Sequence, residues 1–118
     1  MIPAGVQVFL ALEPVDMRFG FERLAGLARE RIGYDARSGA LFVFIGKSRE
    51  TVKILFFDGT GICVFYKRLD RGRFHLPDAS STDITHVEID DGTLETLLDG
   101  IEIEPSGDAS APQRRRLH

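Results

Sequence analysis

The chain has 118 residues, of which 43% are hydrophobic and 28% charged, and its net charge is −3 at neutral pH. This size predicts one domain, and this balance is typical of a globular protein. No apolar run approaches the ~18 residues of a membrane-spanning helix, and no basic start precedes an apolar segment, so we expect neither a membrane span nor a secretory signal. A single cysteine excludes an intramolecular disulfide, and together these features favour a cytoplasmic location.

The first third of the chain predicts a strand followed by a helix. The apolar run Val6–Leu12 predicts the strand, and Asp16 is a residue type that caps helix N-termini. Apolar residues at spacings of three and four over 17–32 indicate one buried helix face. Gly20 inside this segment is explained either by a close backbone approach or by a later helix start. Gly33 is a natural helix end.

The middle of the chain predicts a three-stranded antiparallel meander. Its strands are the apolar, β-branched and aromatic runs Leu41–Ile45, Val52–Phe57 and Ile62–Tyr66. The connections 46–50 and 58–61 hold Gly, Ser and Asp, which are typical of reversals, and they are too short for a crossover helix.

The expected pairing gives this meander two apolar faces. If Phe57 lies opposite Ile62 and Lys53 opposite Tyr66, one face shows Val52, Ile54, Phe56, Cys63, Phe65 and Leu69, with Lys67 at its end. We expect that face to be the core, packed under both helices. The other face shows Lys53, Leu55, Phe57, Ile62, Val64, Tyr66 and Arg68. Two apolar faces indicate either helices on both sides or a face covered by another protein chain.

The last third predicts an edge strand and a second helix. Thr85–Ile89 alternates in polarity, and a leucine-rich stripe after it begins with Thr93 or Asp91 as its cap. The predicted fold class is therefore α+β: an antiparallel sheet of four or five strands, with a longer helix after strand one and a short C-terminal helix. We expect one domain over residues 1–104 and a disordered tail over 105–118.

The ordered motifs of the chain carry a family resemblance. FVFIGKSRETVKILFFDGTGICVFYKRLDRGRF, preceded by PVDMRFGFERLAGL at Pro14–Leu27, resembles the TnpB-type accessory protein encoded by the second open reading frame (Orf2-like) of insertion sequence 66 elements. The resemblance runs from about Val8 to Ile101. It implies a role in DNA transposition beside a separate, larger transposase that carries the strand-transfer chemistry. Its implied partners are that transposase and other products of the same element.

No catalytic set is recognisable, so we expect a protein that is not an enzyme and has no metal or cofactor. His75 and His86 stand outside any metal-binding motif, and Cys63 lies in an apolar strand that would raise its thiol pKa. A two-metal site would need three or more converging carboxylates. Asp58 and Asp70 bracket the third strand of the meander, but Asp58 opens an Asp-Gly turn, and the acids of 78–104 are spread over a loop, an edge strand and a helix surface.

The charge is unevenly distributed along the chain. Residues 47–73 hold seven basic and three acidic side chains, a balance of +4, whereas residues 74–104 hold nine acids and no Lys or Arg. The basic segment is therefore a candidate surface for nucleic acid or a protein partner, with these residues: Lys47, Arg49, Lys53, Tyr66, Lys67, Arg68, Arg71 and Arg73. The alternative is a solvated sheet end neutralised by the acidic segment.

Two functions remain open on these grounds. The leading hypothesis is a non-catalytic accessory factor of transposition that binds the transposase complex, with DNA contacts as a further role. The alternative is a stand-alone DNA- or RNA-binding module that uses the basic segment 47–73. The overall acidity of the chain counts against the alternative.

Overall fold

The structure is a computed structural model that describes residues 5–77 and 84–101. The predicted disordered tail over 105–118 lies outside the described residues. No helix in the described part is both long and apolar enough to span a lipid bilayer.

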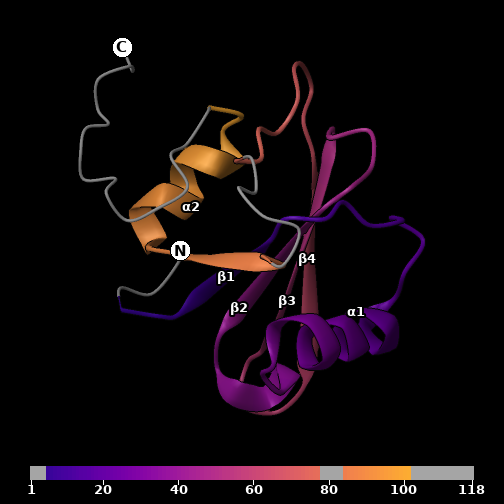
Figure 1. Cartoon of the computed structure of the whole chain (residues 1–118), viewed down its shortest axis with the longest axis vertical. Coiled ribbons are helices and arrows are strands. Elements are labelled where there is room, and N and C mark those ends of the chain that lie inside the picture. The colour runs from indigo at the N-terminus through magenta and orange to yellow at the C-terminus, as the bar shows by residue number, and fades with distance from the viewer. Residues whose placement is uncertain (1–4, 78–83, 102–118) are drawn as a thin grey trace.

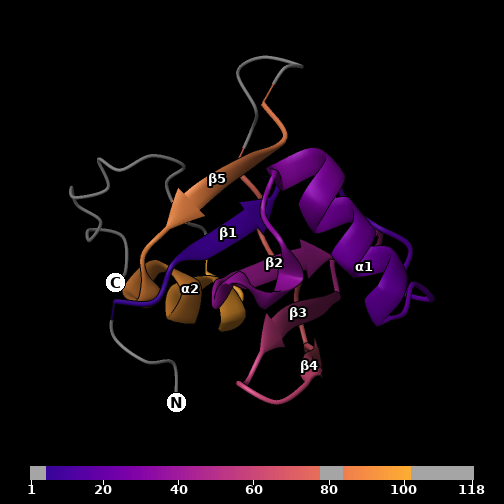
Figure 2. The same ribbon diagram turned by 90° about the horizontal axis from the view of Figure 1, so that it is seen from below.

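The described residues form a five-stranded sheet with helices on both faces, which confirms an α+β fold (Figure 1). The order across the sheet is β4-β3-β2-β1-β5, as Figure 2 shows. The strands are β1 (Val8–Ala11), β2 (Leu41–Ile45), β3 (Thr51–Phe57), β4 (Ile62–Arg68) and β5 (His86–Ile89).

The sheet is mixed, so the prediction of an antiparallel sheet is wrong. Val8 of β1 lies opposite Leu41 of β2 and the two strands are parallel, whereas the other three strand pairs are antiparallel. The physical reason is the connection over residues 12–40. It is long enough to hold a helix that crosses one face and returns the chain to the starting end of the sheet, which a parallel pair requires.

The meander itself is confirmed. Phe57 lies opposite Ile62 and Lys53 opposite Tyr66, in the expected register. The carboxylate of Asp58 accepts hydrogen bonds from the backbone N–H groups of Thr60 and Gly61, each at 2.9 Å, and so fixes the turn between β3 and β4. The edge position of β5 is confirmed as well.

The first helix starts later than expected. α1 (Phe21–Leu27) begins after Gly20, which occupies the N-cap position without a side-chain hydrogen bond, so the prediction of Asp16 as the cap is wrong. A Cβ at Gly20 would meet nothing within 4 Å, so the late start explains this glycine. The helix continues as a π-helical turn, η1 (Ala28–Ile32), and ends as predicted at Gly33, whose φ is 92°.

The second helix, α2 (Asp91–Leu98), is capped by Asp90 rather than by Asp91 or Thr93. The Asp90 carboxylate accepts a 2.7 Å hydrogen bond from the Thr93 backbone N–H, and this bonding lowers the pKa of Asp90. As α-helices, α1 has seven residues and α2 has eight, so the predicted order of a longer and then a shorter helix is also wrong. The π-helical turn takes over the second half of the predicted first helix.

The two helices cover opposite faces of the sheet, which separates the core into two layers. The prediction that both helices cover one face is therefore wrong, and the alternative of helices on both sides is right (Figure 1). Leu94 and Leu97 of α2 pack on Val8, Leu10, Val43, Ile45, Val52 and Ile54. Leu24 of α1, with Ala28 and Ile32 of η1, packs on Phe9, Phe42, Phe44 and Leu55.

The end of β2 is joined to the segment after β1 through Gly46. Val15 donates a 2.9 Å hydrogen bond to the Ile45 carbonyl and forms a parallel bridge with Gly46. A Cβ on Gly46 would collide with Thr51 Oγ1 and would lie 2.9 Å from Met17 Cγ. Thr51 Oγ1 is buried and has no hydrogen-bond partner among the described residues. Glycine is therefore required here because the side chains of Thr51 and Met17 approach this position closely.

Substitution of this glycine should destabilise the protein. For Gly46→Ala we expect the free energy of unfolding in urea to fall by about 1–3 kcal/mol, the usual cost of overpacking. The matched control is Gly26→Ala inside α1, where a Cβ would meet nothing within 4 Å. That change should raise the free energy of unfolding by about 0.5–1 kcal/mol through helix propensity. Equal stability of Gly46→Ala and the wild type would contradict the close approach.

Candidate functional site

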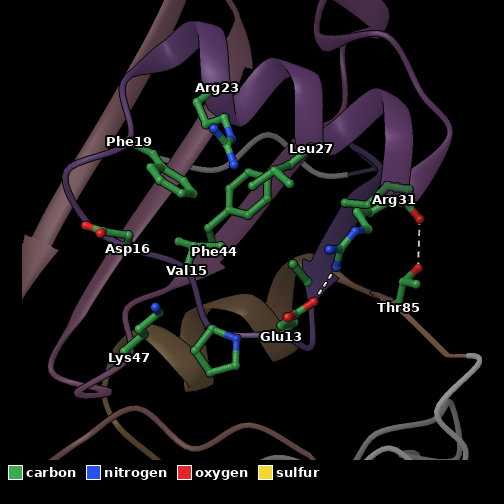
Figure 3. A pocket seen from close by; sticks show the side chains of 13 residues that line it. Glu13, Val15, Asp16, Phe19, Arg23, Leu27, Arg31, Phe44, Lys47 and Thr85 are labelled. Carbon is green, nitrogen blue, oxygen red and sulfur yellow. Dashed lines mark hydrogen bonds and ion pairs between the residues drawn. The ribbon is translucent and has the colours of Figure 1, made fainter.

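A pocket of about 220 Å³ lies at the carboxyl ends of the parallel strands β1 and β2, on the face covered by α1 (Figure 3). In open sheets with parallel strands, this end is the usual place for ligands. The floor of the pocket is apolar and is formed by Ala11, Val15, Leu27, Ile32 and Phe44. The rim carries charged side chains from three separate segments of the chain.

Two rim carboxylates are already paired with arginines. Glu13 forms an ion pair with Arg31 of η1, drawn in Figure 3. Asp16 accepts a 2.6 Å hydrogen bond from the guanidinium of Arg18. The hydrogen bonds from Arg18 hold the pKa of the Asp16 carboxyl well below its ordinary range, so Asp16 is ionised at neutral pH.

Two rim cations remain. The Arg23 guanidinium lies 4.5 Å from the centroid of the Phe19 ring, and Lys47 lies on the opposite side of the pocket from Arg23 in Figure 3. Within the described residues neither has a carboxylate at ion-pair distance. The pocket therefore joins an apolar floor to two cations that are available to a negatively charged ligand group.

The π-helical turn places Arg31 at this rim. The Arg31 carbonyl accepts a 2.7 Å hydrogen bond from Thr85 Oγ1, and Leu12 N donates a 3.0 Å bond to the Thr85 carbonyl. The start of β5 is thus held against the end of η1. π-Helical turns are rare and occur often at functional sites.

Three residues of the predicted basic surface have partners inside the molecule. The Lys53 ammonium donates to the carbonyls of Met17 and Phe19 at 2.8 and 3.1 Å. Lys67 donates a 2.8 Å hydrogen bond to the Leu98 carbonyl at the end of α2, where a cation also favours the helix dipole. Arg68 pairs with Glu50 at 3.4 Å.

The other predicted cations lie on two loops that run side by side. Phe74 N donates to the Arg49 carbonyl at 2.6 Å, and Leu69 N donates to the Glu50 carbonyl at 2.9 Å. The two loops are the ones at the top of Figure 1. The exposed cations that they carry are Lys47, Arg49, Arg71 and Arg73. Tyr66 is 52% exposed on β4, with the Lys53 ammonium 5.7 Å from its ring centroid.

The remaining titratable candidates have structural surroundings. Cys63 is half-buried in β4, and desolvation together with the neighbouring Asp58 raises the pKa of its thiol. His86 lies in β5 with its ring 5.6 Å from that of Phe9, and burial lowers its pKa. Among residues 5–77 and 84–101, no three His, Cys, Asp or Glu side chains gather as metal ligands.

Of the residues that line the pocket, the sequence analysis predicted only Lys47 as a binding residue. Arg23, Leu27 and Arg31 recur every four residues, a spacing that places them on one side of a helix. This spacing is the feature of the sequence that indicates part of the pocket. Phe19, Glu13 and Asp16 offered no comparable pattern, because they reach the pocket only through the folded path between β1 and α1.

The described residues thus form an α+β fold with an apolar pocket and two cations at its rim. The chain belongs to the family described as IS66 Orf2 like protein, whose model matches residues 6–107. It is accordingly an accessory protein associated with an insertion sequence.

Two curated relatives come from Sinorhizobium fredii (strain NBRC 101917 / NGR234). "Uncharacterized protein y4hO" is 42% identical over 104 residues, which is 86% of this chain and 88% of the relative. "Uncharacterized protein y4jC" is 32% identical over 73 residues, 62% of each chain. No solved structure matches this chain.

The internal bonds of Lys53 predict a structural role. Lys53→Met should lower the free energy of unfolding in urea by about 2 kcal/mol, because two carbonyls lose a charged donor. The control, Lys47→Met, removes an exposed cation of the same type and should change stability by less than about 0.5 kcal/mol. If the two variants are equally stable, Lys53 is free to act as a surface ligand after all.

Proposed function

We propose that this protein is a non-catalytic accessory factor of transposition that binds the transposase of its own insertion sequence through the pocket under α1. The observation that carries the proposal is the pocket's combination of an apolar floor with the available cations Arg23 and Lys47. The family membership supplies the biological setting.

The size of the pocket favours a protein segment over a free metabolite. Its volume of about 220 Å³ lies below the range of about 300–1,000 Å³ typical of small-molecule sites. Such a pocket suits one apolar or aromatic side chain, the kind of anchor that dominates protein–protein interfaces. Arg23 and Lys47 then select a segment in which carboxylates flank that anchor.

Charge reversal at the rim tests this proposal. Arg23→Glu should weaken binding of the purified transposase at least tenfold in a titration, because an attraction for the acidic segment becomes a repulsion. The matched control is Arg37→Glu, which makes the same charge change at an exposed residue outside the pocket. Equal weakening by both variants would show a general charge effect and would contradict binding at the pocket.

A second candidate function is DNA or RNA binding in its own right, favoured by the side-by-side placement of the two basic loops. Lys47, Arg49, Arg71 and Arg73 would contact phosphates, with Tyr66 beside them as a stacking ring. Glu50 and Asp70 lie in the same loops and reduce the net positive charge.

The double variant Arg71→Ala/Arg73→Ala tests this alternative. If these loops bind phosphates, the slope of log affinity against log salt for a labelled transposon-end duplex should become shallower by about 1–2, in a fluorescence anisotropy titration. Arg29→Ala/Arg37→Ala removes the same charge away from the loops and should leave that slope unchanged. No binding by the wild type even at low salt would rule this function out.

A further inference from the structure

Among the described residues no strand pairs with the outer side of β4, which presents a long and apolar free edge. It is the outermost strand next to β3 and has seven residues. Val64, Phe65 and Tyr66 at its centre are 37%, 44% and 52% exposed. The opposite edge, β5, has only four residues and carries the exposed acid Glu88. Proteins protect edges by such shortness and charge, so β5 is protected whereas β4 is open to pairing.

Two backbone hydrogen bonds identify the groups that face this edge. Leu69 N bonds to the Glu50 carbonyl and Asp58 N to the Gly61 carbonyl, and both pairs continue the β3–β4 register. Hydrogen-bonded and non-hydrogen-bonded pairs alternate along antiparallel strands. Residues 63, 65 and 67 therefore bond to β3, and the residues whose N–H and C=O groups point to the free edge are Ile62, Val64, Tyr66 and Arg68.

We propose that two copies of this chain pair through β4 in an antiparallel, two-fold arrangement centred on Phe65. In this register Ile62 lies opposite Arg68 of the second copy and Val64 lies opposite its Tyr66. All four outward-facing residues then enter hydrogen-bonded pairs, so the full strand is used. Lys67 lies opposite Cys63, so no cation faces a cation. Moving the centre to Lys67 would place two ammonium groups opposite each other, which is unfavourable.

The charges of β4 favour a second copy over an acidic strand from another protein. Lys67 and Arg68 already have internal partners, the Leu98 carbonyl and Glu50. The part of the edge that remains is apolar and matches itself in the Phe65-centred register. Residues directly opposite in an antiparallel pair point to the same face. The two sets of five strands would form one ten-stranded sheet, with both α1 helices and both pockets on one face.

A proline substitution tests the free edge. Val64 N–H points away from β3, so Val64→Pro keeps the internal ladder but removes an edge donor. The full chain of 13.2 kDa should sediment with a mass that rises toward twice that value with concentration. Each dimer contains the substitution twice, so two hydrogen bonds between the copies are lost and the dissociation constant should rise at least tenfold. Val64→Thr keeps the N–H and the β-branched shape and should leave dimerisation intact.

Cross-linking tests the register without relying on that variant. In a Cys63→Ser background, Phe65→Cys should form an intermolecular disulfide readily, because non-hydrogen-bonded partners have Cα atoms ~4.5 Å apart. Tyr66→Cys is at least as exposed but lies diagonal to its own copy, at about 7–8 Å, and should cross-link much more slowly.

A wild-type chain that is monomeric at all concentrations would overturn the proposal. The edge of β4 would then be open to pairing with a strand of another protein. A dimer that survives Val64→Pro, or equal cross-linking of the two cysteine variants, would overturn it as well. If circular dichroism shows that Val64→Pro is unfolded, the ratio of the two cross-linking rates decides.

Discussion

The parallel pairing of β1 with β2 is the constraint on which the rest of this structure depends. Two adjacent strands can run in the same direction only if the chain crosses a face between them, and here α1 and η1 make that crossing. Both strands are buried on both faces, since α2 covers the other side. The same pairing brings the ends of β1 and β2 together, and the pocket opens at that point.

Positive charge in this protein serves two different purposes. Lys53 and Lys67 donate hydrogen bonds to backbone carbonyl groups at the turn before α1 and at the end of α2. Burying such carbonyls unpaired would cost more than a surface ion pair returns. Arg23 and Lys47 have no carboxylate at ion-pair distance among the described residues, and they line the pocket, so in the proposed function they contact the partner.

The pocket and the free edge of β4 are separate surfaces. The pocket lies at the ends of the central strands, whereas β4 is at the margin of the sheet. Capture of a partner segment and pairing of two copies would therefore not compete for the same side chains. A two-fold pair would also present two pockets on one face, so a partner with two binding segments would gain in apparent affinity.

The sequence by itself determined the elements that depend on near neighbours. The three strands of the meander, the Asp58 turn and the end of the first helix at Gly33 follow from local patterning and turn chemistry, and the motifs of 14–27 and 42–74 identified the family. Only the tertiary structure decided the parallel pairing, the separation of the helices onto two faces, and which cations are internal. Lys53 shows why: its carbonyl partner on Met17 is 36 residues away, and a contact over such a distance leaves no periodic signal in the chain. The pocket was missed for the same reason, since it forms where separate segments meet.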